Sequence, residues 1–368
     1  MIGDRERYTA RWERAQALMK RYRFDLLLVS PSSDFFYLLG QPGHLSTRLT
    51  LLVLPDEGRP ALLAGALEMP GYAAWEDALT LLPWRDDEAP LEVLRRAFAP
   101  VSVSSIAVSD RLWSVFLLQL QETYRAARWY SAAPVLRTLR AVKDAAELAT
   151  MREASRRADL VWEAFARQPV AGLTERQAAA RLEALLADQG MPPAFETIVA
   201  AGPNGASPHH RPGERVIAPG DPLVCDFGGV LDGYCSDMTR TAHVGPPGDQ
   251  FRSVYSIVKR AQETAFRAVR PGARCEEVDA AARWVIEAAG YGERFIHRTG
   301  HGLGIDIHEE PYLVKGNRQP LQPGMVFSDE PGIYLPGQFG VRIEDIVAVT
   351  ESGAERLNNA SRELTVLE

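Results

Sequence analysis

Histidines and acids gather in one stretch near the C-terminal end of the chain. His297, His301 and His308 come first, and Glu330 and Glu344 follow, all among apolar residues and glycines. Ionisable side chains in such strand-like, apolar surroundings are costly to bury unless something neutralises them. A bound metal ion is the simplest neutralising group, so this stretch predicts part of a metal site.

Two predicted β-hairpins carry the acids. In the first, Asp226 and Asp237 flank a Leu-Asp-Gly turn at 231–233, and we expect them to lie opposite each other on one face. In the second, Glu330 and Glu344 flank a Pro-Gly-Gln turn symmetrically. Each hairpin therefore predicts a pair of carboxylates on one face.

Four carboxylates in one pocket would repel one another, and like charges at close range must share protons or cations. His301 adds a nitrogen donor. Such a set suits two divalent ions about 3.5–4 Å apart with shared oxygen ligands. A single acid near a turn is more often a solvated surface group, so the prediction rests on all of these residues together.

The C-terminal part of the chain repeats itself at an offset of about 100 residues. The matched positions are glycine, phenylalanine and acid pairs: Gly172 and Gly272, Gly190 and Gly290, Gly220 and Gly324, Phe195 and Phe295, and Asp226 and Glu330. Each half reads as two helices followed by a strand hairpin. Two such halves are expected to pack as a pseudo-symmetric unit, with strands inside and helices outside.

The first third of the chain alternates predicted helices and strands. Helices are expected at 4–22, 66–77, 90–97 and 111–127, and strands at 24–30, 49–54, 60–63, 79–82 and 105–109. This alternation predicts an α/β layer in which helices cover a sheet. We place the domain boundary after residue 137, which gives domains 1–137 and 138–368.

A long polar loop is expected at 31–48, where Asp34, His44 and Arg48 lie. Long polar loops carry function more often than core segments do, although many are simply solvated surface. His44 stands alone and is expected to be an exposed bystander.

Composition and charge exclude several classes of protein. The net charge of −7 argues against a nucleic-acid partner, because phosphate binding needs a basic surface. No apolar run approaches the ~18 residues of a membrane span, and the N-terminus lacks a signal-peptide pattern. The three cysteines form no CxxC pair and are expected to be reduced and buried. We therefore expect a cytoplasmic protein with no nucleic-acid or membrane partner.

The duplicated hairpins with their five polar residues resemble those of the pita-bread metallopeptidases, which include prolidase, aminopeptidase P, creatinase and methionine aminopeptidase. The resemblance covers the whole chain. It implies an α+β fold, with an N-terminal creatinase-like α/β domain followed by a pseudo-symmetric C-terminal pita-bread domain. It also implies two divalent metal ions per subunit, held by Asp226, Asp237, His301, Glu330 and Glu344, of which Asp237 and Glu344 match the positions that bridge both ions.

The resemblance further implies roles around the metals. Glu330, besides being a ligand, is expected to act as the general base. His209 and His308 are expected to donate hydrogen bonds to the tetrahedral intermediate and to hold the substrate. His297 matches another auxiliary histidine and is expected to face the substrate.

Three further residues of the second hairpin are expected at the site. Arg342 matches an arginine of the family and is expected to orient Glu344, or else to meet a substrate carboxylate. An Xaa-Pro bond has no N–H, so its pocket needs apolar walls. Tyr334 and Phe339 are expected to help form them.

The implied reaction is hydrolysis of Xaa-Pro dipeptides by attack of a metal-bridging hydroxide on the peptide carbonyl. The compact segment GHGLGIDIHEEP lacks the insertions of many aminopeptidases P, which favours a dipeptidase. The alternatives are an aminopeptidase P, which removes the first residue from longer Xaa-Pro peptides, and a catalytically inactive peptide-binding relative. Creatinase and such inactive relatives lack the metal ligands that are present here. Oxygen-rich ligation favours Mn²⁺, with Co²⁺ or Zn²⁺ as alternatives.

A dipeptidase must also bind the free C-terminal carboxylate of its substrate. Arg48 is expected to cap the site, with Asp34 nearby. Because the site capped in this way is expected to be that of a partner subunit, we expect a homodimer.

Overall fold

The computed structural model describes residues 2–99 and 103–368. The chain divides into two compact units, Met1–Arg140 and Ala141–Glu368. This division falls inside helix α5 (Ala133–Ala141), and the boundary expected after residue 137 falls in the same helix. Among the described residues, no helix combines the length and the apolar character needed to cross a membrane.

The first unit is built on a six-stranded mixed sheet with the order β4-β3-β2-β1-β5-β6. β1 pairs antiparallel with β2 and parallel with β5, so it lies in the middle of the sheet, and every residue of its LLLV sequence is buried. The strands are β1 (Leu26–Val29), β2 (Leu51–Pro55), β3 (Ala61–Gly65), β4 (Thr80–Trp84), β5 (Ser105–Val108) and β6 (Arg128–Ser131). The expected α/β layer is thus present.

The helices of this unit differ from the expected ones in three places. The helix expected at 66–77 is a shorter 3₁₀ helix, Met69–Trp75. The expected helix at 111–127 is shorter, and the strand β6 follows it. The polar loop expected at 31–48 contains helix α2, because Ser32 caps its start, Gly40 (φ 71°) ends it, and its apolar side chains are buried. The helical segments are α1 (Ile2–Tyr22), α2 (Ser33–Leu39), the 3₁₀ helix η1 (Met69–Trp75), α3 (Pro90–Ala97) and α4 (Ser114–Thr123), followed by α5.

The second unit is duplicated, as the repeat predicts. Each half begins with a helix pair: α6 (Ala145–Ala166) and α7 (Glu175–Asp188), then α8 (Asp249–Ala268) and α9 (Cys275–Ala288). The paired glycines of the repeat share the left-handed conformation that favours glycine, with φ 89° at Gly172 and 81° at Gly272. The repeat in sequence is therefore a repeat of backbone conformation.

Two larger sheets and two hairpins lie between the helix pairs. One sheet has the order β19-β11-β8-β7; the first half supplies β11, β8 and β7, and β19 comes from the end of the chain. The second half supplies the sheet β13-β12-β14-β17-β18. The strands are β7 (Ile198–Ala201), β8 (Pro222–Phe227), β9 (Val230–Leu231), β10 (Tyr234–Cys235), β11 (Met238–Val244), β12 (Gly300–Gly302), β13 (Glu309–Leu313), β14 (Val326–Asp329), β15 (Gly332–Leu335), β16 (Phe339–Arg342), β17 (Asp345–Val349), β18 (Ala354–Arg356) and β19 (Thr365–Leu367). The short 3₁₀ helices are η2 (Gly202–Ala206) and η3 (Gly292–Arg294).

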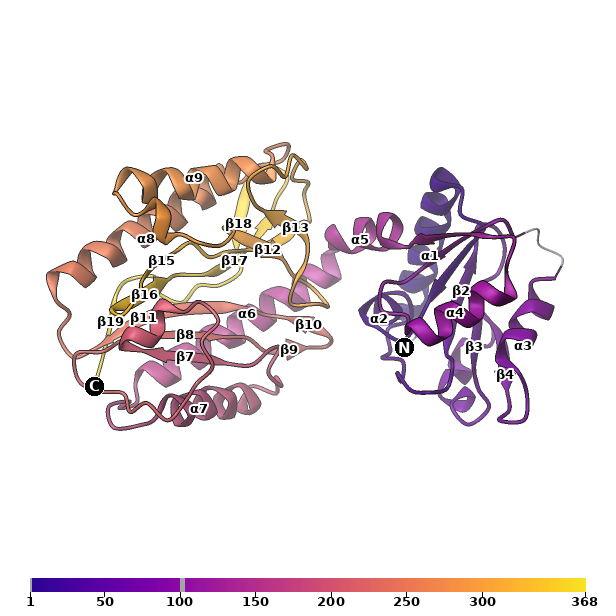
Figure 1. Ribbon diagram of the computed structural model, residues 1–368, viewed down its shortest axis with the longest axis horizontal. Coiled ribbons are helices and arrows are strands. Elements are labelled where there is room, and N and C mark those ends of the chain that lie inside the picture. Colours follow the sequence, from indigo (N-terminus) through magenta and orange to yellow (C-terminus); the bar gives the residue numbers. More distant parts are fainter. Residues whose placement is uncertain (1, 100–102) are drawn as a thin grey trace. The chain divides into compact units, whose positions relative to one another are not determined.

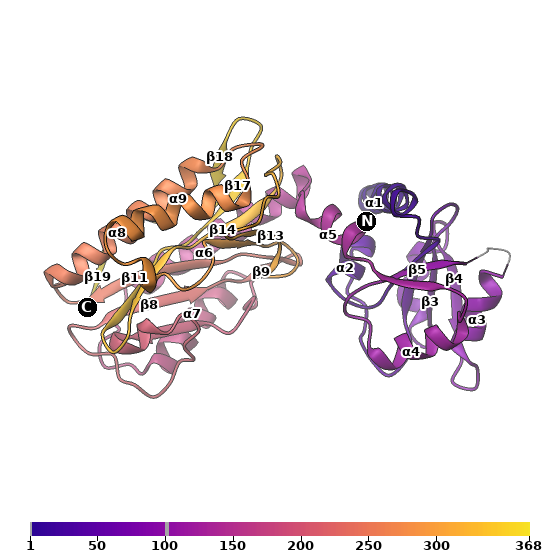
Figure 2. The ribbon, with the colours of Figure 1, turned by 45° about the horizontal axis from the view of Figure 1, so that its top comes forward.

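Each helix pair packs on the strands of its own half. Buried side chains of α6 and α7 form one apolar core with β7, β8 and β11, whereas those of α8 and α9 form another with β14, β16 and β17. In Figures 1 and 2, α8 and α9 lie together on one side of the strands and α7 lies on the other. The strands are thus enclosed by helices, which confirms the expected arrangement.

The register of the first hairpin differs from the expected one. Its turn consists of two residues, Asp232 and Gly233, both with positive φ, instead of the three residues 231–233. Asp226 pairs with Thr239 and not with Asp237. Asp237 lies two residues before Thr239, so it shares the face of Asp226 along a diagonal. The second hairpin has the expected symmetric register: Asp329 pairs with Asp345 and Gly332 with Arg342, which sets Glu330 opposite Glu344.

Candidate functional site

A cavity of about 400 Å³ opens in the second unit where the strands of the two halves meet. It is lined by all the predicted metal ligands and by most of the predicted auxiliary residues: Asp226, Asp237, His301, Glu330, Glu344, His209, His297, His308 and Arg342. Phe195, Ile198 and Ile307 add apolar surface, and Arg298 adds a cation. The site predicted from residues in different parts of the sequence therefore forms one cavity.

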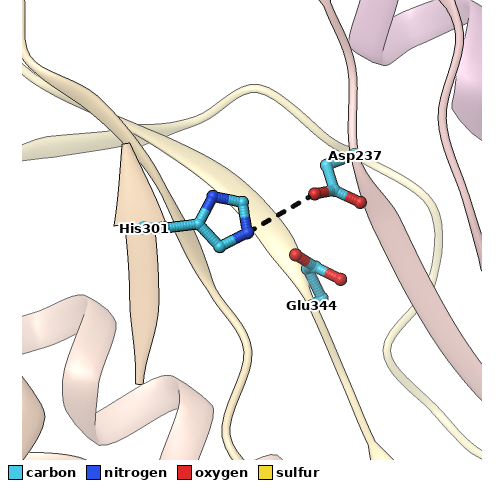
Figure 3. A group of neighbouring side chains, drawn as sticks. All are labelled: Asp237, His301 and Glu344. Carbon is cyan, nitrogen blue, oxygen red and sulfur yellow. Dashed lines mark ion pairs between the residues drawn. The ribbon is translucent and has the colours of Figure 1, made fainter. Parts of the chain in front are cut away.

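Strand ends position the acids and His301. Asp226 lies in β8, Asp237 immediately precedes β11, and His301 lies in β12. Glu330 follows β14, and Glu344 lies between β16 and β17. Figure 3 shows Asp237, His301 and Glu344 converging from separate segments, and a ligand atom of each lies within 4.8 Å of those of the other two. This trio is buried, which is typical of a metal site enclosed by protein.

His301 presents an unprotonated nitrogen to the acids. Its Nδ1 donates a hydrogen bond to the carbonyl oxygen of Gly302 (3.1 Å), while Nε2 lies 3.3 Å from Glu330 and 3.7 Å from Asp237. Burial, followed by the neighbouring His308, lowers the pKa of His301 to about 3. The imidazole is therefore neutral near pH 7, and its Nε2 lone pair points at carboxylate oxygens. The lone pair and the carboxylate oxygens repel each other, and a cation between them would remove this repulsion.

The carboxyl groups hold protons unusually tightly in the absence of a cation. Burial, then the charge of nearby acids, raises the pKa of Asp237 and of Glu344 well above the ordinary value. Burial likewise raises the pKa of Glu330 to about 7. Asp226 has one oxygen, Oδ1, that is buried and has no hydrogen-bond partner in the described residues. Unsatisfied oxygens and mutually repelling carboxylates fit a divalent cation site.

Arg342 is the buried cation behind the acids. Its Nη2 donates to Asp226 Oδ2 (2.6 Å) and its Nε donates to the hydroxyl of Thr239 (3.0 Å). Thr239 in turn donates to Glu344 Oε2 (2.6 Å). Arg342 thus contacts Asp226 directly and reaches Glu344, its expected partner, through Thr239. The sequence reasoning missed Thr239, although it lies two residues after Asp237 and hence on the same strand face.

Tyr334 is placed differently from the expected substrate contact. It is buried and is absent from the described residues that line the cavity. Its hydroxyl accepts from Arg342 Nη1 (2.9 Å) and donates to His297 Nε2 (2.8 Å). Phe339 packs against Phe251 in the core of the second half. The hydroxyl of Tyr334 therefore connects Arg342 to His297 through two hydrogen bonds. Neither Tyr334 nor Phe339 is among the described residues that line the cavity.

His297 is fixed from both ring nitrogens. Its Nδ1 donates to the carbonyl oxygen of Arg298 (2.7 Å), so Nε2 is the acceptor for Tyr334. Burial, then the charge of Arg342, lowers the pKa of His297 to about 3. The ring of His308 packs edge-on against that of His301, with centroids 4.1 Å apart. His209, His297 and His308 all reach the cavity, as the sequence predicts.

Asp34 and Arg48 belong to the first unit and have ion-pair partners there. Asp34 lies in α2 and accepts from Arg140 Nη1 at 2.7 Å. Arg48 contacts Asp86 at 2.5 Å and Glu68 at 3.7 Å. Their expected role at an active site stays a prediction.

Comparisons with known proteins agree with this geometry. The model of metallopeptidase family M24 matches residues 149–351, and the model of the creatinase/prolidase N-terminal domain matches residues 11–142. The chain belongs to metallopeptidase family M24. The fold is accordingly a creatinase-type N-terminal domain followed by a pita-bread domain, as the resemblance implies.

Similar M24 proteins share the full length of this chain. A probable dipeptidase PepE of Mycobacterium tuberculosis is 42% identical, over 99% of this chain and 98% of the relative. An Xaa-Pro dipeptidase of Lactobacillus helveticus is 33% identical, over 93% of this chain and 95% of the relative. The crystal structure of recombinant prolidase from Thermococcus sibiricus superimposes with a TM-score of 0.92 at 41% identity, covering 98% of this chain and 99% of that one.

Proposed function

We propose that this M24 protein is a metal-dependent Xaa-Pro dipeptidase with two divalent ions per subunit. The observation that carries the proposal is one cavity whose lining includes the largely buried Asp226, Asp237, Glu330 and Glu344 together with a neutral His301. These metal-binding residues argue against the alternative of a catalytically inactive peptide-binding protein, because such a protein has no need of them. Mn²⁺ is the ion that the oxygen-rich set favours, with Co²⁺ or Zn²⁺ as alternatives.

The residues present fit the metals. Asp237 and Glu344 would be shared by both ions, Asp226 would complete the site of one ion, and His301 with Glu330 would complete that of the other. When bound, such a pair of ions lowers the pKa of water and polarises a peptide carbonyl. The unpartnered Oδ1 of Asp226 and the free Nε2 of His301 are the atoms of this chain that support the assignment.

The proton chemistry falls to side chains of the chain itself. Glu330 lines the cavity beside His301, with its Oε1 3.3 Å from Nε2 of His301, and would take a proton from water and return it to the leaving amine. His209 and His308 line the same cavity and would donate hydrogen bonds to the developing oxyanion. Arg342 keeps Asp226 in place through a 2.6 Å hydrogen bond.

Specificity for Xaa-Pro is supported by the cavity walls and by the named relatives. The Lactobacillus relative is called an Xaa-Pro dipeptidase and the Thermococcus structure a prolidase. A proline ring needs apolar surface and no acceptor for an amide hydrogen. Phe195, Ile198 and Ile307 supply apolar surface on the cavity.

The binding of the substrate's C-terminal carboxylate is assigned to Arg48, with Asp34 nearby, in a homodimer whose subunits cap each other's sites. Because Asp86 and Arg140 pair with these two charges, the capping role requires an exchange of partners. In Arg48→Ala, the KM for Ala-Pro should rise and cleavage of Ala-Pro-Pro should improve. If neither changes, the capping role should be dropped.

The deciding experiment is hydrolysis of Ala-Pro, Leu-Pro and Ala-Pro-Pro by metal-stripped protein with Mn²⁺, Co²⁺ or Zn²⁺ restored. We expect cleavage of both dipeptides, dependent on added metal, and little cleavage of the tripeptide. Comparable cleavage of the tripeptide would indicate an aminopeptidase P. Absence of cleavage with every ion would overturn the enzyme assignment and leave a peptide-binding protein.

A further inference from the structure

The segment 202–213 presents His209 to the cavity although it has little regular structure. It contains the short helix η2 and otherwise turns and bends. A histidine that must meet a transition state has to be held rigidly, so something outside the segment must fix it. The structure identifies two such contacts.

Glu175 is the first contact. It is fully buried at the first turn of α7, and its side chain accepts four hydrogen bonds. Oε1 accepts from the backbone N–H of Ala201 (2.8 Å) and from Asn204 Nδ2 (2.9 Å). Oε2 accepts from His210 Nε2 (2.8 Å) and from the backbone N–H of Gly213 (3.1 Å). The residue just before the segment, two residues within it and its last residue are therefore tied to one carboxylate.

The α7 helix holds Glu175 in place. Thr174 and Gln177 form a reciprocal capping box at its first turn, and the backbone N–H of Glu175 donates to the carbonyl oxygen of Arg215 (3.0 Å). Burial raises the pKa of the Glu175 carboxyl, but hydrogen bonds led by Ala201, with His210 next, outweigh burial and leave the pKa below its ordinary value. The group is thus a carboxylate at neutral pH.

Strand β16 provides the second contact. A Cβ atom at Gly340 would overlap the carbonyl oxygen of Gly205, so the backbones of η2 and β16 touch. Arg342, in the same strand, has its Nη1 3.4 Å from the carbonyl oxygen of Pro208. The segment is therefore held between the start of α7 and the strand that carries Arg342.

We propose that Glu175 is a positioning residue, which fixes segment 202–213 so that His209 meets the substrate in the active cavity. This inference rests on the proposed function, since it presumes that His209 acts on a substrate. The carboxylate is needed because all four partners are donors. In Glu175→Gln, one oxygen becomes an NH₂ group that faces a donor, and at least one of the hydrogen bonds is lost.

A first test measures, without any substrate, how firmly Glu175 holds the segment 202–213. Hydrogen exchange followed by mass spectrometry should show faster exchange of the amides at 201–213 in Glu175→Gln, because the Ala201 and Gly213 amides donate to the carboxylate. Glu277→Gln is the matched control: this exposed glutamate caps α9, and glutamine serves the same position in α7. Unchanged exchange at 201–213 in Glu175→Gln would overturn the proposal.

A second test asks whether Glu175 acts through His209. With Mn²⁺ restored, Glu175→Gln should lower kcat/KM for Ala-Pro by about 10–100-fold, as for other groups that orient active-site residues. Its Mn²⁺ stoichiometry by titration calorimetry should stay that of the wild type. In a His209→Ala background the same substitution should change kcat/KM by less than about twofold. A full, additive loss in that background means a general structural role and contradicts the proposal.

Further outcomes distinguish a failure of the proposed function from a failure of the role of Glu175. If the wild type cleaves no Xaa-Pro substrate but Glu175→Gln speeds amide exchange at 201–213, the proposed function is wrong. The inference that Glu175 holds the segment is then retained. If Glu175→Gln does not fold, Asn204→Ala removes one of the four donors while leaving the carboxylate. That variant should show the same effects in smaller measure, and wild-type behaviour in both assays would overturn the proposal.

Discussion

At the scale of residues, the site combines groups whose charges conflict without a cation. Asp237, Glu330 and Glu344 have raised pKa values because they are buried together, whereas the pKa of His301 is lowered. Arg342 offsets part of the negative charge through Asp226. Two predictions follow from these residues.

The first concerns metal-free protein. Glu330 has a pKa of about 7 when folded and about 4.5 when exposed, so between these values the folded state binds more protons. Stability must then fall as the pH rises from about 4.5 to about 7, and stay level above that range with respect to this group. We expect the Tm of metal-stripped protein to fall over this window, and added Mn²⁺ to raise the Tm more at pH 7.5 than at pH 5. A Tm shift independent of pH would contradict this.

The second concerns the geometry of Arg342. Arg342→Lys keeps the charge but loses the planar fork that contacts Asp226, Thr239 and Tyr334 together. We expect Mn²⁺ affinity or kcat/KM for Ala-Pro to fall about 10–100-fold, measured by calorimetry and dipeptide hydrolysis. Arg156→Lys is the control, since Arg156 is an exposed helix residue paired with Glu153. Equal behaviour of the two variants would show that charge alone suffices.

At the scale of elements, two hairpins and the segments packed on them build the cavity. The first hairpin turns through Asp232 and Gly233, and the second sets Glu330 opposite Glu344. A close approach between two backbones in this region joins η2 to β16, at Gly205 and Gly340. No side chain fits between these two backbones.

This close approach predicts that Gly340→Ala destabilises the protein. The added methyl group must push η2 away from β16, at a cost of about 1–3 kcal/mol in the free energy of unfolding. Denaturation in urea measures it. Gly353→Ala is the control, because a Cβ atom at Gly353 meets nothing within 4 Å. Two equally stable variants would rule out the tight contact.

At the scale of the whole molecule, the described residues that line the cavity all belong to the second unit. That unit has two apolar cores of its own, one for each half. It also contains the buried ion pair of Lys143 with Glu309, whose Nζ and Oε1 atoms lie 2.8 Å apart, near the start of the unit. A unit with its own cores is expected to fold alone.

We therefore expect a fragment 141–368 to unfold cooperatively in urea and to bind two Mn²⁺ per chain. Circular dichroism and calorimetry would measure these properties. The full chain treated in the same way is the reference. If the fragment is unfolded, or folds but binds no metal, the metal site depends on the first unit.

The sequence by itself determined the candidate ligands and the duplicated plan. Two similar hairpins carry acids beside their turn residues, and His301 lies near the second hairpin. Such local patterns can be recognised in the sequence before the fold is known. The paired glycines of the repeat were likewise recognised from the sequence, and the structure adds that they share a left-handed conformation.

Only the tertiary structure decided which groups meet and in what state. The hydrogen bond between Asp226 and Arg342 and the four hydrogen bonds of Glu175 join residues distant in sequence. The burial of His301 and the position of Tyr334 behind the cavity also depend on the packing of several elements. The exact hairpin register also emerged only there: the turn is Asp232-Gly233, and Asp226 pairs with Thr239 instead of Asp237. Such contacts depend on packing between elements, for which a single sequence carries no periodic signal.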